Sequence, residues 1–364
     1  MSALYVGIMS GTSLDGIDCV LIQASEGGYQ QLADHFTPYP PSLREDLLSL
    51  HRPDENELHL AQMLANRLTR SYADAVHALL DKAAVLPADV RAIGCHGQTI
   101  RHRPEFGYTI QLNNAALLAE LTGIRVVSDF RSRDIAAGGQ GAPLVPAFHD
   151  RVLRSPSASR AIVNIGGISN LTLLPVGPEP VTGFDCGPGN LLMDAWISRH
   201  RGLAYDRNGE WAASGVPLPS LLERLLRESY FSAPPPKSCG RDLFNLEWLE
   251  SHLEGNEQPA DVQATLLGLS ARSVADSISR HAPTTREIWL CGGGAHNAEL
   301  KRQLAALLPG CTIGVTDELG IGADWVEAFA FAWLAEQALL GIPANLPAVT
   351  GARHPCILGA IYPA

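Results

Sequence analysis

The stretch GIMSGTSLDG, residues 7–16, joins two apolar runs, Leu4–Met9 and Gly16–Ile22. Both runs have the length of buried strands, and the small and polar residues between them favour a tight turn. We therefore expect a β-hairpin. Glycine in such a turn lets a phosphate oxygen approach backbone N–H groups closely, and the hydroxyls of Thr12 and Ser13 would add donors. Taken alone, the stretch predicts nothing more than a hairpin.

Two more glycine turns follow apolar runs, NIGGISNL at 164–171 and CGGGAHN at 291–297. Neither a G-x-x-x-x-G-K-[ST] loop nor a G-x-G-x-x-G fingerprint after the first strand occurs, so the sequence lacks P-loop and Rossmann signatures. The turns fall in the first hairpin of each half of the chain and after a late strand. This placement favours two similar domains that hold a nucleotide, with phosphates at the first two turns and adenosine at the third.

The order of expected elements repeats along the chain. In the first half we expect strands at 4–9, 16–22, 29–36, 90–95 and 124–128, helices at 58–84 and 114–122, and a polar turn at 96–99. In the second half we expect strands at 160–165, 169–174, 181–184, 287–290 and 311–315, and helices at 190–200, 262–281, 297–308 and 324–340. Asp261 is the expected N-cap of the helix at 262–281. Strands interleaved with helices predict an α/β fold with mixed sheets.

Domain boundaries are indicated by prolines and serines. Pro143, Pro146 and the SPSAS stretch at 155–159 interrupt regular structure. We expect an N-terminal domain at 1–142 and a C-terminal domain at 143–364. The second would carry an insertion around 202–258, and its final segment would pack back on the first domain.

Composition narrows the class of protein. The 364 residues carry a net charge of −11, which argues against nucleic acid and anionic membranes as partners. Seven cysteines without a C-x-x-C pair indicate reduced thiols. The N-terminus has no export signal and no stretch reads as a membrane span, so we expect a cytoplasmic protein.

Several polar side chains stand out as candidates for chemistry. Asp185 follows an apolar strand and precedes a glycine turn, so it could face a ligand as a base or cap the next helix; Asn190 is better placed for the cap. Glu327 on the last helix is either exposed at an edge or a ligand for hydroxyl groups. The side chains after two first-half strands are either solvated or gathered at the ligand crevice: His96, Gln98, Arg131 and Arg133. Lys237 and Arg241 in the insertion could close over phosphate or substrate.

The combination of strings resembles a known family. The order of the three turns resembles the actin/Hsp70/hexokinase superfamily. Within it, the resemblance is to the anhydro-N-acetylmuramic acid kinase family, over residues 5 to about 340. The strings that carry it are MSGTSLDGID (9–18), GCHGQT (94–99), SDFRSRDIAAGGQGAPLVP (128–146), NIGGISN (164–170), GFDCGPGN (183–190), PKSCGRD (236–242), CGGGAHN (291–297) and DWVEAFAFAWLA (324–335).

The resemblance implies two ribonuclease-H-like domains, each a mixed five-stranded sheet flanked by helices, with the nucleotide in the cleft between them. It implies use of ATP and Mg²⁺, a 1,6-anhydro-N-acetylmuramic acid substrate, a homodimer, and Asp185 as the catalytic base. The implied ATP-binding residues are Gly11, Thr12, Ser13, Leu14, Asp15, Gly16, Ile17, Asp18, Asn164, Gly166, Gly167, Gly292, Gly293, Gly294 and Asn297. The implied substrate-binding residues are His96, Gly97, Gln98, Arg131, Arg133, Asp185 and Glu327.

One departure from the superfamily concerns the metal. Where other members place an aspartate in the first two turns, this chain has Met9 and Asn164. The sequence therefore leaves open which residues hold Mg²⁺. Two alternative functions also stay open: a kinase of the same fold that phosphorylates a free sugar hydroxyl or a carboxylate, and an ATP-gated binding protein without a small-molecule acceptor.

Overall fold

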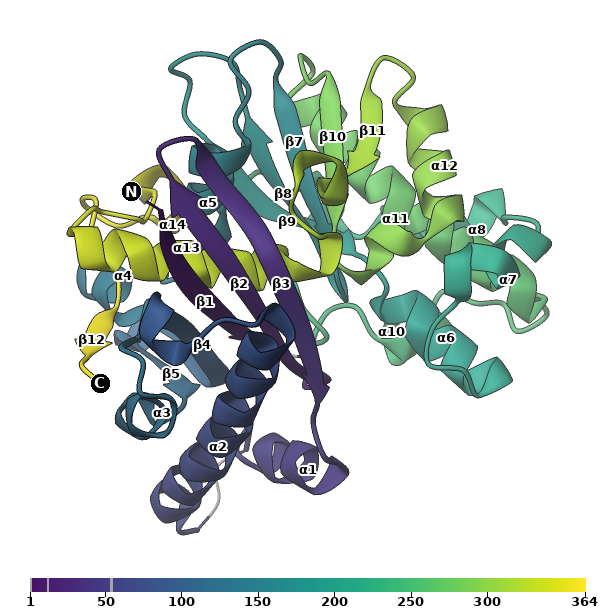
Figure 1. Cartoon of the computed structure of the whole chain (residues 1–364). Coiled ribbons are helices and arrows are strands. Elements are labelled where there is room, and N and C mark those ends of the chain that lie inside the picture. The colour runs from purple at the N-terminus through teal and green to yellow at the C-terminus, as the bar shows by residue number, and fades with distance from the viewer. Residues whose placement is uncertain (1, 12, 53–54) are drawn as a thin grey trace. The chain divides into compact units, whose positions relative to one another are not determined.

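The computed structural model describes residues 2–11, 13–52 and 55–364. The chain forms two compact units, unit 1 from residues 1–152 and 320–364 and unit 2 from residues 153–319 (Figure 1). The first division lies ten residues beyond the expected boundary at 142, because helix α5 (Val145–Leu153) packs within unit 1. There the Phe148 ring lies against Phe329 and Trp333, with ring centroids 5.3 and 5.9 Å away.

Unit 1 is built on a seven-stranded sheet in the order β12-β6-β4-β1-β2-β3, with β5 paired to β4. The strands are β1 (Ala3–Ser10), β2 (Gly16–Ser25), β3 (Gly28–Pro38), β4 (Val90–Arg103), β5 (Tyr108–Leu112), β6 (Val126–Ser128) and β12 (Ala360–Tyr362). The first three strands form an antiparallel meander, and β4 runs parallel to both β1 and β6. The expected five strands are present, and β5 and β12 enlarge the sheet beyond that number.

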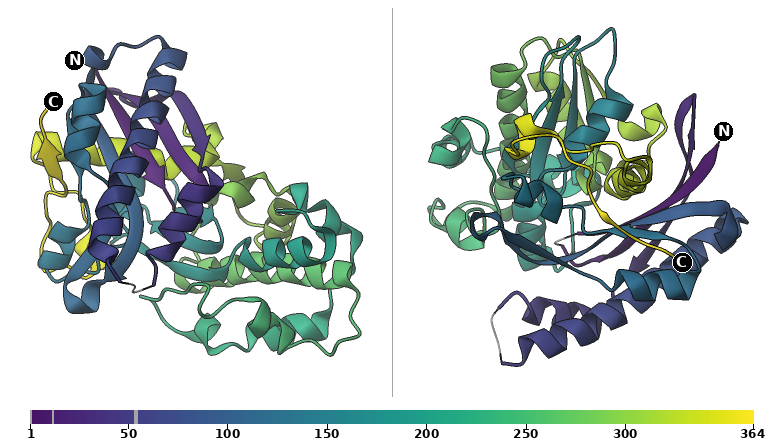
Figure 2. Two further views of the ribbon diagram at one scale, coloured as in Figure 1. Left: turned by 90° about the horizontal axis from the view of Figure 1, so that it is seen from below. Right: turned by 90° about the vertical axis from the view of Figure 1, so that its left-hand side faces the viewer.

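Helices cover both faces of this sheet. Figure 2 (right) shows α2 on one face and α13 on the other. The unit 1 helices are α1 (Pro41–Ser49), α2 (Glu57–Ala83), α3 (Ala115–Thr122), α4 (Ser132–Ala136), α5, α13 (Val326–Leu340) and α14 (Pro347–Thr350). Leu68, Tyr72, Val76 and Leu79 repeat at helical spacing on α2 and are fully buried in the core. Helix α3 follows its N-cap Asn114, whose side chain accepts from Leu117 N, and is followed by the C-cap Gly123.

Two glycines let α13 lie directly on the sheet. Gly7 of β1 and Gly94 of β4 are partners in the parallel register. A Cβ at Gly7 would lie 1.8 Å from the Ala328 carbonyl oxygen, and one at Gly94 would lie 1.9 Å from the Phe331 carbonyl oxygen. Only glycine permits this approach. The contact fixes α13, and therefore Glu327, against the strands that carry His96 and Asp18.

Unit 2 has a five-stranded sheet in the order β11-β10-β7-β8-β9. Its strands are β7 (Arg160–Ile165), β8 (Ile168–Leu174), β9 (Thr182–Pro188), β10 (Glu287–Cys291) and β11 (Thr312–Val315). Strands β7 to β9 form an antiparallel meander, and β10 runs parallel to β7 and β11. This repeats the order β6-β4-β1-β2-β3 of unit 1, which confirms the expected α/β class with two mixed sheets.

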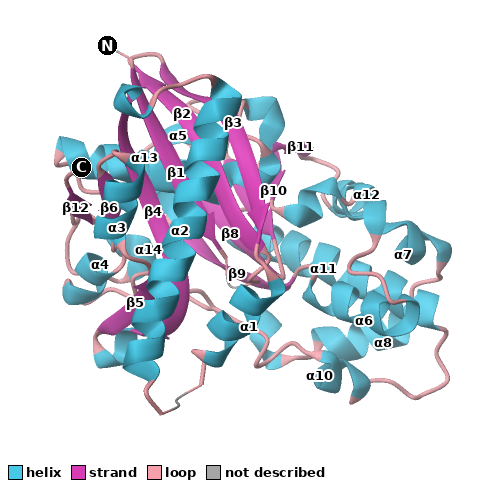
Figure 3. Cartoon of the chain, turned by 60° about the horizontal axis from the view of Figure 1, so that its bottom comes forward, coloured by secondary structure: helices cyan, strands magenta, loops and turns pink. Residues whose placement is uncertain are grey.

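The unit 2 helices are α6 (Leu191–Arg201), α7 (Glu210–Ser214), α8 (Pro219–Leu226), α9 (Ser229–Ser232), α10 (Leu246–Glu250), α11 (Pro259–His281) and α12 (Ala298–Leu307). Figure 3 shows the helical region formed by α6 to α8, α10 and α11. The expected insertion at 202–258 contains the four short helices α7 to α10. The long helix α11 packs on β8 and β9, with most of its side chains buried.

Four local expectations are wrong in whole or in part. Residues 96–99 form no turn, because β4 continues to Arg103 and Gly97, with φ of 80°, marks a register shift instead. Asp261 is no N-cap, since α11 begins at Pro259 and the Asp261 carboxylate accepts from Val216 N. Asn190 occupies the N-cap position of α6 as expected, but its side chain makes no cap hydrogen bond and donates to Ile165 O instead. Asp185 lies inside β9 rather than at its end.

Two further findings concern membrane-spanning helices and disulfides. In the part that the structure describes, no helix is long and apolar enough to cross a bilayer. All seven cysteines lie in that part, and no disulfide joins them.

Candidate functional site

In unit 1, the turn between β1 and β2 has an unusual backbone. Leu14 has a φ of 57° and a buried side chain, and its N–H donates to Gly11 O at 3.2 Å. Asp15 is exposed, and its carbonyl accepts from Tyr39 N at 3.0 Å. Of the predicted ATP-binding residues, Ser13 is exposed here, Gly16, Ile17 and Asp18 begin β2, and Thr12 lies outside the described residues.

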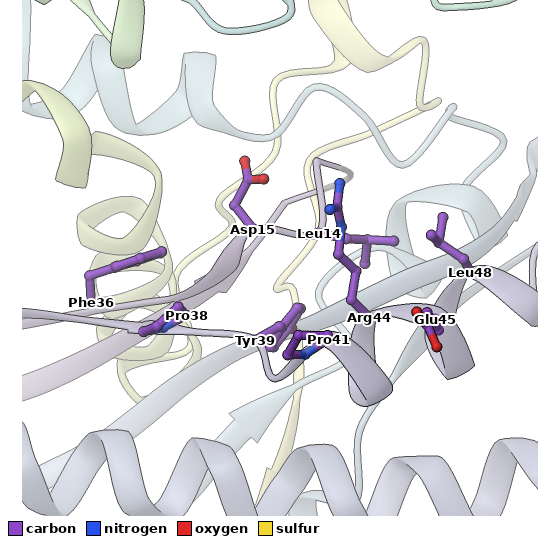
Figure 4. Close-up of a pocket in the computed structure, with 9 residues that line it drawn as sticks. All are labelled: Leu14, Asp15, Phe36, Pro38, Tyr39, Pro41, Arg44, Glu45 and Leu48. Carbon is purple, nitrogen blue, oxygen red and sulfur yellow. The ribbon is translucent and has the colours of Figure 1, made fainter. Parts of the chain in front are cut away.

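A pocket of about 450 Å³ lies beside this turn. Figure 4 shows the side chains of Asp15 and Arg44 projecting on the same side of it. Its lining comes from the turn, the end of β3 and helix α1: Leu14, Asp15, Phe36, Pro38, Tyr39, Pro41, Arg44, Glu45 and Leu48. Sequence reasoning missed α1 and its arginine, although Pro41 at a helix start was a usable signal.

Buried hydroxyl and amide groups hold the turn from behind. Gln98 donates through Nε2 to Gly11 O at 3.1 Å, and its Oε1 accepts from the Tyr39 hydroxyl at 3.2 Å. The Ser10 hydroxyl bonds the Tyr72 hydroxyl at 2.6 Å and donates to Gly97 O at 3.2 Å. Gln98 is fully buried, so in this structure its amide supports the turn.

Arg131 and His96 form the next contact in unit 1. The Arg131 guanidinium donates from Nε to His96 Nε2 at 3.1 Å and from NH1 to Gly141 O at 2.7 Å. Burial and the neighbouring Arg131 charge hold the pKa of His96 well below its usual range. The ring is therefore neutral and accepts at Nε2. It also lies on Phe331, with ring centroids 4.6 Å apart.

Two carboxylates, those of Glu327 and Asp134, interact with the charge of Arg131. Burial lowers the pKa of Arg131 to about 10, and the charges of Glu327 and Asp134 oppose that shift, so the guanidinium stays charged near neutrality. Burial raises the pKa of Glu327, while Arg131 lowers it. Burial, followed by the charges of Glu327, Asp324 and Asp15, raises the pKa of Asp18 to about 7. The structure thus brings His96, Arg131 and Glu327 together, whereas Arg133 is exposed on α4.

In unit 2, the predicted turns at 164–167 and 292–294 meet. Gly292 has a φ of 75°, and a Cβ there would lie 2.3 Å from Asn164 Oδ1. A Cβ at Gly294 would lie 2.3 Å from Ile165 Cγ2. Gly166 and Gly167 accept through their carbonyls from the N–H groups of Asn190 and Leu191 at the start of α6. Asn297 caps α12 by accepting from Leu300 N, so its side chain is used within unit 2.

Asp185 is partly buried on β9, the edge strand of the unit 2 sheet. Its Oδ2 accepts from Cys239 N at 3.0 Å, and its backbone carbonyl accepts from the Tyr230 hydroxyl at 2.7 Å. Burial raises the pKa of Asp185, and the Cys239 N–H lowers it. Sequence reasoning missed Cys239 and Tyr230, because only the fold brings them to β9. The candidate residues therefore form two groups, one in each unit.

Repeated sheets of one strand order, each with a glycine turn after its first strand, define the actin/Hsp70/hexokinase class of protein. The chain belongs to the anhydro-N-acetylmuramic acid kinase family, because that family's model matches residues 3–364. A relative of that name from Nitrosospira multiformis is 60% identical over 100% of both chains. Further relatives of that name come from Nitrosomonas europaea, 58% identical over 99% of both chains, and Pseudomonas fluorescens, 51% identical over 99% of both.

Solved structures resemble the chain more distantly. Component A of (R)-2-hydroxyglutaryl-CoA dehydratase from Acidaminococcus fermentans is 12% identical, with a TM-score of 0.49 over 91% of this chain and 96% of that one. A ROK family glucokinase from Streptomyces griseus in complex with glucose and AMPPNP is 13% identical, with a TM-score of 0.40 over 92% of this chain and 100% of that one.

Proposed function

We propose that this protein is an ATP-dependent kinase that opens 1,6-anhydro-N-acetylmuramic acid with water and phosphorylates O6. The products are N-acetylmuramic acid 6-phosphate and ADP. Membership of the anhydro-N-acetylmuramic acid kinase family supports the substrate class. The reaction belongs to the recycling of cell-wall peptidoglycan and to amino-sugar catabolism.

ATP would be held by the glycine turns of both units. We assign the phosphates to residues 11–18 and to Asn164, Gly166 and Gly167, and the adenosine to Gly292–Gly294 and Asn297. The open space at Gly11, Gly166 and Gly167, where a Cβ would meet nothing closer than 3.5 Å, supports close approach of phosphate oxygens to the backbone.

Mg²⁺ would bind together with the phosphates of ATP. No group of three or more His, Cys, Asp or Glu side chains in the described ranges forms a metal site by itself. Mg²⁺ commonly keeps several waters and binds one or two carboxylates together with substrate phosphates, and Asp18 among its acidic neighbours offers such a carboxylate. The ion would neutralise charge on the γ-phosphate.

The sugar would be recognised by His96, Gly97, Gln98, Arg131, Arg133, Asp185 and Glu327. The charged Arg131 guanidinium suits the carboxylate of the lactyl group. The partly buried Glu327 suits sugar hydroxyls. Gln98 would act through the turn that it supports, since its amide already bonds Gly11 and Tyr39.

Asp185 would act as the general base. Its carboxylate takes a proton from water, the water oxygen forms a bond to C1, and the C1–O6 bond breaks. O6 then attacks the γ-phosphorus, the bond from that phosphorus to the β–γ bridging oxygen breaks, and ADP leaves. The proton on Asp185 passes to solvent. Positioned base catalysis of this kind contributes about 10²–10⁴-fold.

One observation carries this assignment. Asp185 Oδ2 is held by Cys239 N–H, while Oδ1 has no hydrogen-bond partner among the described residues. A carboxylate fixed at one oxygen and open at the other can hold water in one orientation.

The test is an assay of ADP release with ATP and 1,6-anhydro-N-acetylmuramic acid, run in ¹⁸O-labelled water. We expect one label at C1 of the product and none in the phosphate. Label in the phosphate would identify a plain ATPase. Phosphorylation of N-acetylmuramic acid but not of the anhydro sugar would identify an ordinary sugar kinase.

We further propose that the protein acts in the cytoplasm as a homodimer, without a nucleic-acid partner. The net charge of −11 supports the last point. Sedimentation equilibrium of the purified chain tests the dimer, and a monomer at micromolar concentration would contradict it.

A further inference from the structure

Among the described residues, the strand that carries Asp185 has no strand partner on its outer side. β9 is the edge of the unit 2 sheet, so the backbone groups on that side need other partners. Residues 230–239, here named the covering segment, supply them. Asp185 N donates to Lys237 O at 3.1 Å, and Asp185 O accepts from the Tyr230 hydroxyl at 2.7 Å.

The covering segment also contacts the carboxylate itself. Cys239 N donates to Asp185 Oδ2 at 3.0 Å. The backbone N–H, the backbone carbonyl and one carboxylate oxygen of Asp185 are therefore all bonded to one segment. A carboxylate bonded at one oxygen, on a backbone bonded at two further points, keeps its orientation far better than one held at its Cα alone.

The covering segment is itself fixed by packing. The Tyr230 ring meets the buried Phe244 edge to face, with ring centroids 5.8 Å apart. Lys237 Nζ lies 4.6 Å from the centre of the same ring and donates to Tyr230 O at 3.0 Å. Phe231 fills the space beside Gly187, where a Cβ would lie 2.7 Å from the ring. Gly187 follows Asp185 by two residues, so the covering segment contacts β9 at both positions.

We infer that the covering segment positions the catalytic base, with Tyr230 and the backbone N–H of Cys239 as positioning groups. The inference rests on the proposed function of Asp185. The covering segment, which lies outside the sheet, thereby takes part in the reaction. Tyr230 fixes the Asp185 backbone, and the Cys239 N–H directs Oδ1 toward water.

The pKa of Asp185 depends on its burial and on the charged and titratable groups around it. The Cys239 N–H is the contact that favours the carboxylate, and burial opposes it. The other such groups on neighbouring elements are Cys186 on β9, Tyr230, Lys237, Cys239 and Asp242 in and after the covering segment, and Arg280 and His281 on α11. Loss of the N–H alone therefore raises the pKa of Asp185.

The experiment compares Cys239→Pro, which removes the N–H, with Cys239→Ala, which keeps it. ADP release is measured with ATP and the anhydro sugar as a function of pH. We expect the proline variant to have a kcat about 10-fold below that of the alanine variant. The fall of kcat on the acid side of the pH profile should also occur at higher pH in the proline variant. A base with a raised pKa becomes protonated sooner as the pH falls. If the two variants have the same kcat and the same pH profile on the acid side, the inference is overturned.

Tyr230→Phe gives an independent result if the proline variant does not fold. It removes only the hydroxyl, and we expect kcat to fall several-fold while the KM for ATP stays unchanged. Tyr205→Phe, at a half-exposed tyrosine of the same unit, is the control and should match the parent. A Tyr230→Phe enzyme with the parent kcat would also overturn the inference. An unmodified enzyme that releases no ADP with the anhydro sugar would instead reject the proposed function.

Discussion

Gly7 and Gly94 face each other across two parallel strands, and the backbone of one helix crosses both. The pair decides how near α13 lies to the unit 1 sheet. Since α13 carries Glu327 and Phe331, the pair also decides where these side chains meet Arg131 and His96.

Gly7→Ala should therefore destabilise unit 1. Its new methyl group would lie 1.8 Å from the Ala328 carbonyl oxygen, a backbone atom that cannot move alone. We expect the free energy of unfolding in urea to fall by roughly 2–4 kcal/mol. Gly27→Ala, at an exposed turn where the nearest atom is 3.7 Å away, is the matched control and should change it little. Equal stability of the two variants would mean that α13 shifts without cost.

Asp185→Asn should retain nucleotide binding and lose turnover. An amide cannot take the proton from water, and we expect kcat to fall by about 10²–10⁴-fold. Titration calorimetry with a non-hydrolysable ATP analogue measures binding separately from turnover. Glu179→Gln, at an exposed site before β9, serves as the comparison. A kcat near that of the parent would refute the role of Asp185 as the base.

Asp18 should make stability depend on pH. Its folded pKa of about 7 exceeds the ordinary value of 3.8. The folded state therefore binds a proton that the unfolded state has released, and stability falls as pH rises from about 4 to about 7. After allowance for partial solvent screening, we expect a loss of roughly 1–3 kcal/mol from this group.

The variant Asp18→Asn removes that loss. Its free energy of unfolding should depend less on pH over this range than that of the parent, and its Tm at pH 8 should be higher. Asp89→Asn, at an exposed position, should leave the pH dependence as it is. An unchanged slope in Asp18→Asn would show that the carboxylate is well solvated.

Thr350→Val should weaken the link between the C-terminal segment and Asp134 of α4. The fully buried Asp134 accepts through Oδ1 from Asn345 Nδ2 at 2.6 Å and Thr350 Oγ1 at 2.7 Å, and through Oδ2 from Gly141 N at 2.8 Å. Valine keeps the shape and removes one donor to a charged acceptor, which costs about 1.5–3 kcal/mol.

Urea unfolding measures this loss, with Thr284→Val at an exposed site as the control. Gly141 O in turn accepts from Arg131, so the affinity for the sugar should fall as well. A stable variant with unchanged affinity would show that water replaces the hydroxyl.

Much of the fold follows from local pattern. The hairpin at residues 4–22 and the helices α2 and α3 were predictable, because strand-length apolar runs, helical spacing and caps are signals within one segment. Strand β12 was not, since its partner β6 lies more than 200 residues earlier. The polar run at 96–99 indicated a turn, but pairing with β1 and β5 keeps it in a strand.

The candidate site shows the same division. Glycine spacing and polar residues near strand ends indicated Asp185, His96 and Arg131. The partners that set their properties come from distant segments: Cys239 and Tyr230 for Asp185, and Glu327 for the charge of Arg131. The sequence does not show which distant residues meet in the fold, so the shifts in pKa could not be inferred from it.

Unit 1 is assembled from the first 152 residues and the last 45, with α13 among the latter. During synthesis, all of unit 2 leaves the ribosome before the helix that closes unit 1. Until then the surface that α13 covers at Gly7 of β1 and Gly94 of β4 stays without its helix. The enzyme can therefore complete unit 2 before unit 1, although the chain of unit 1 begins first.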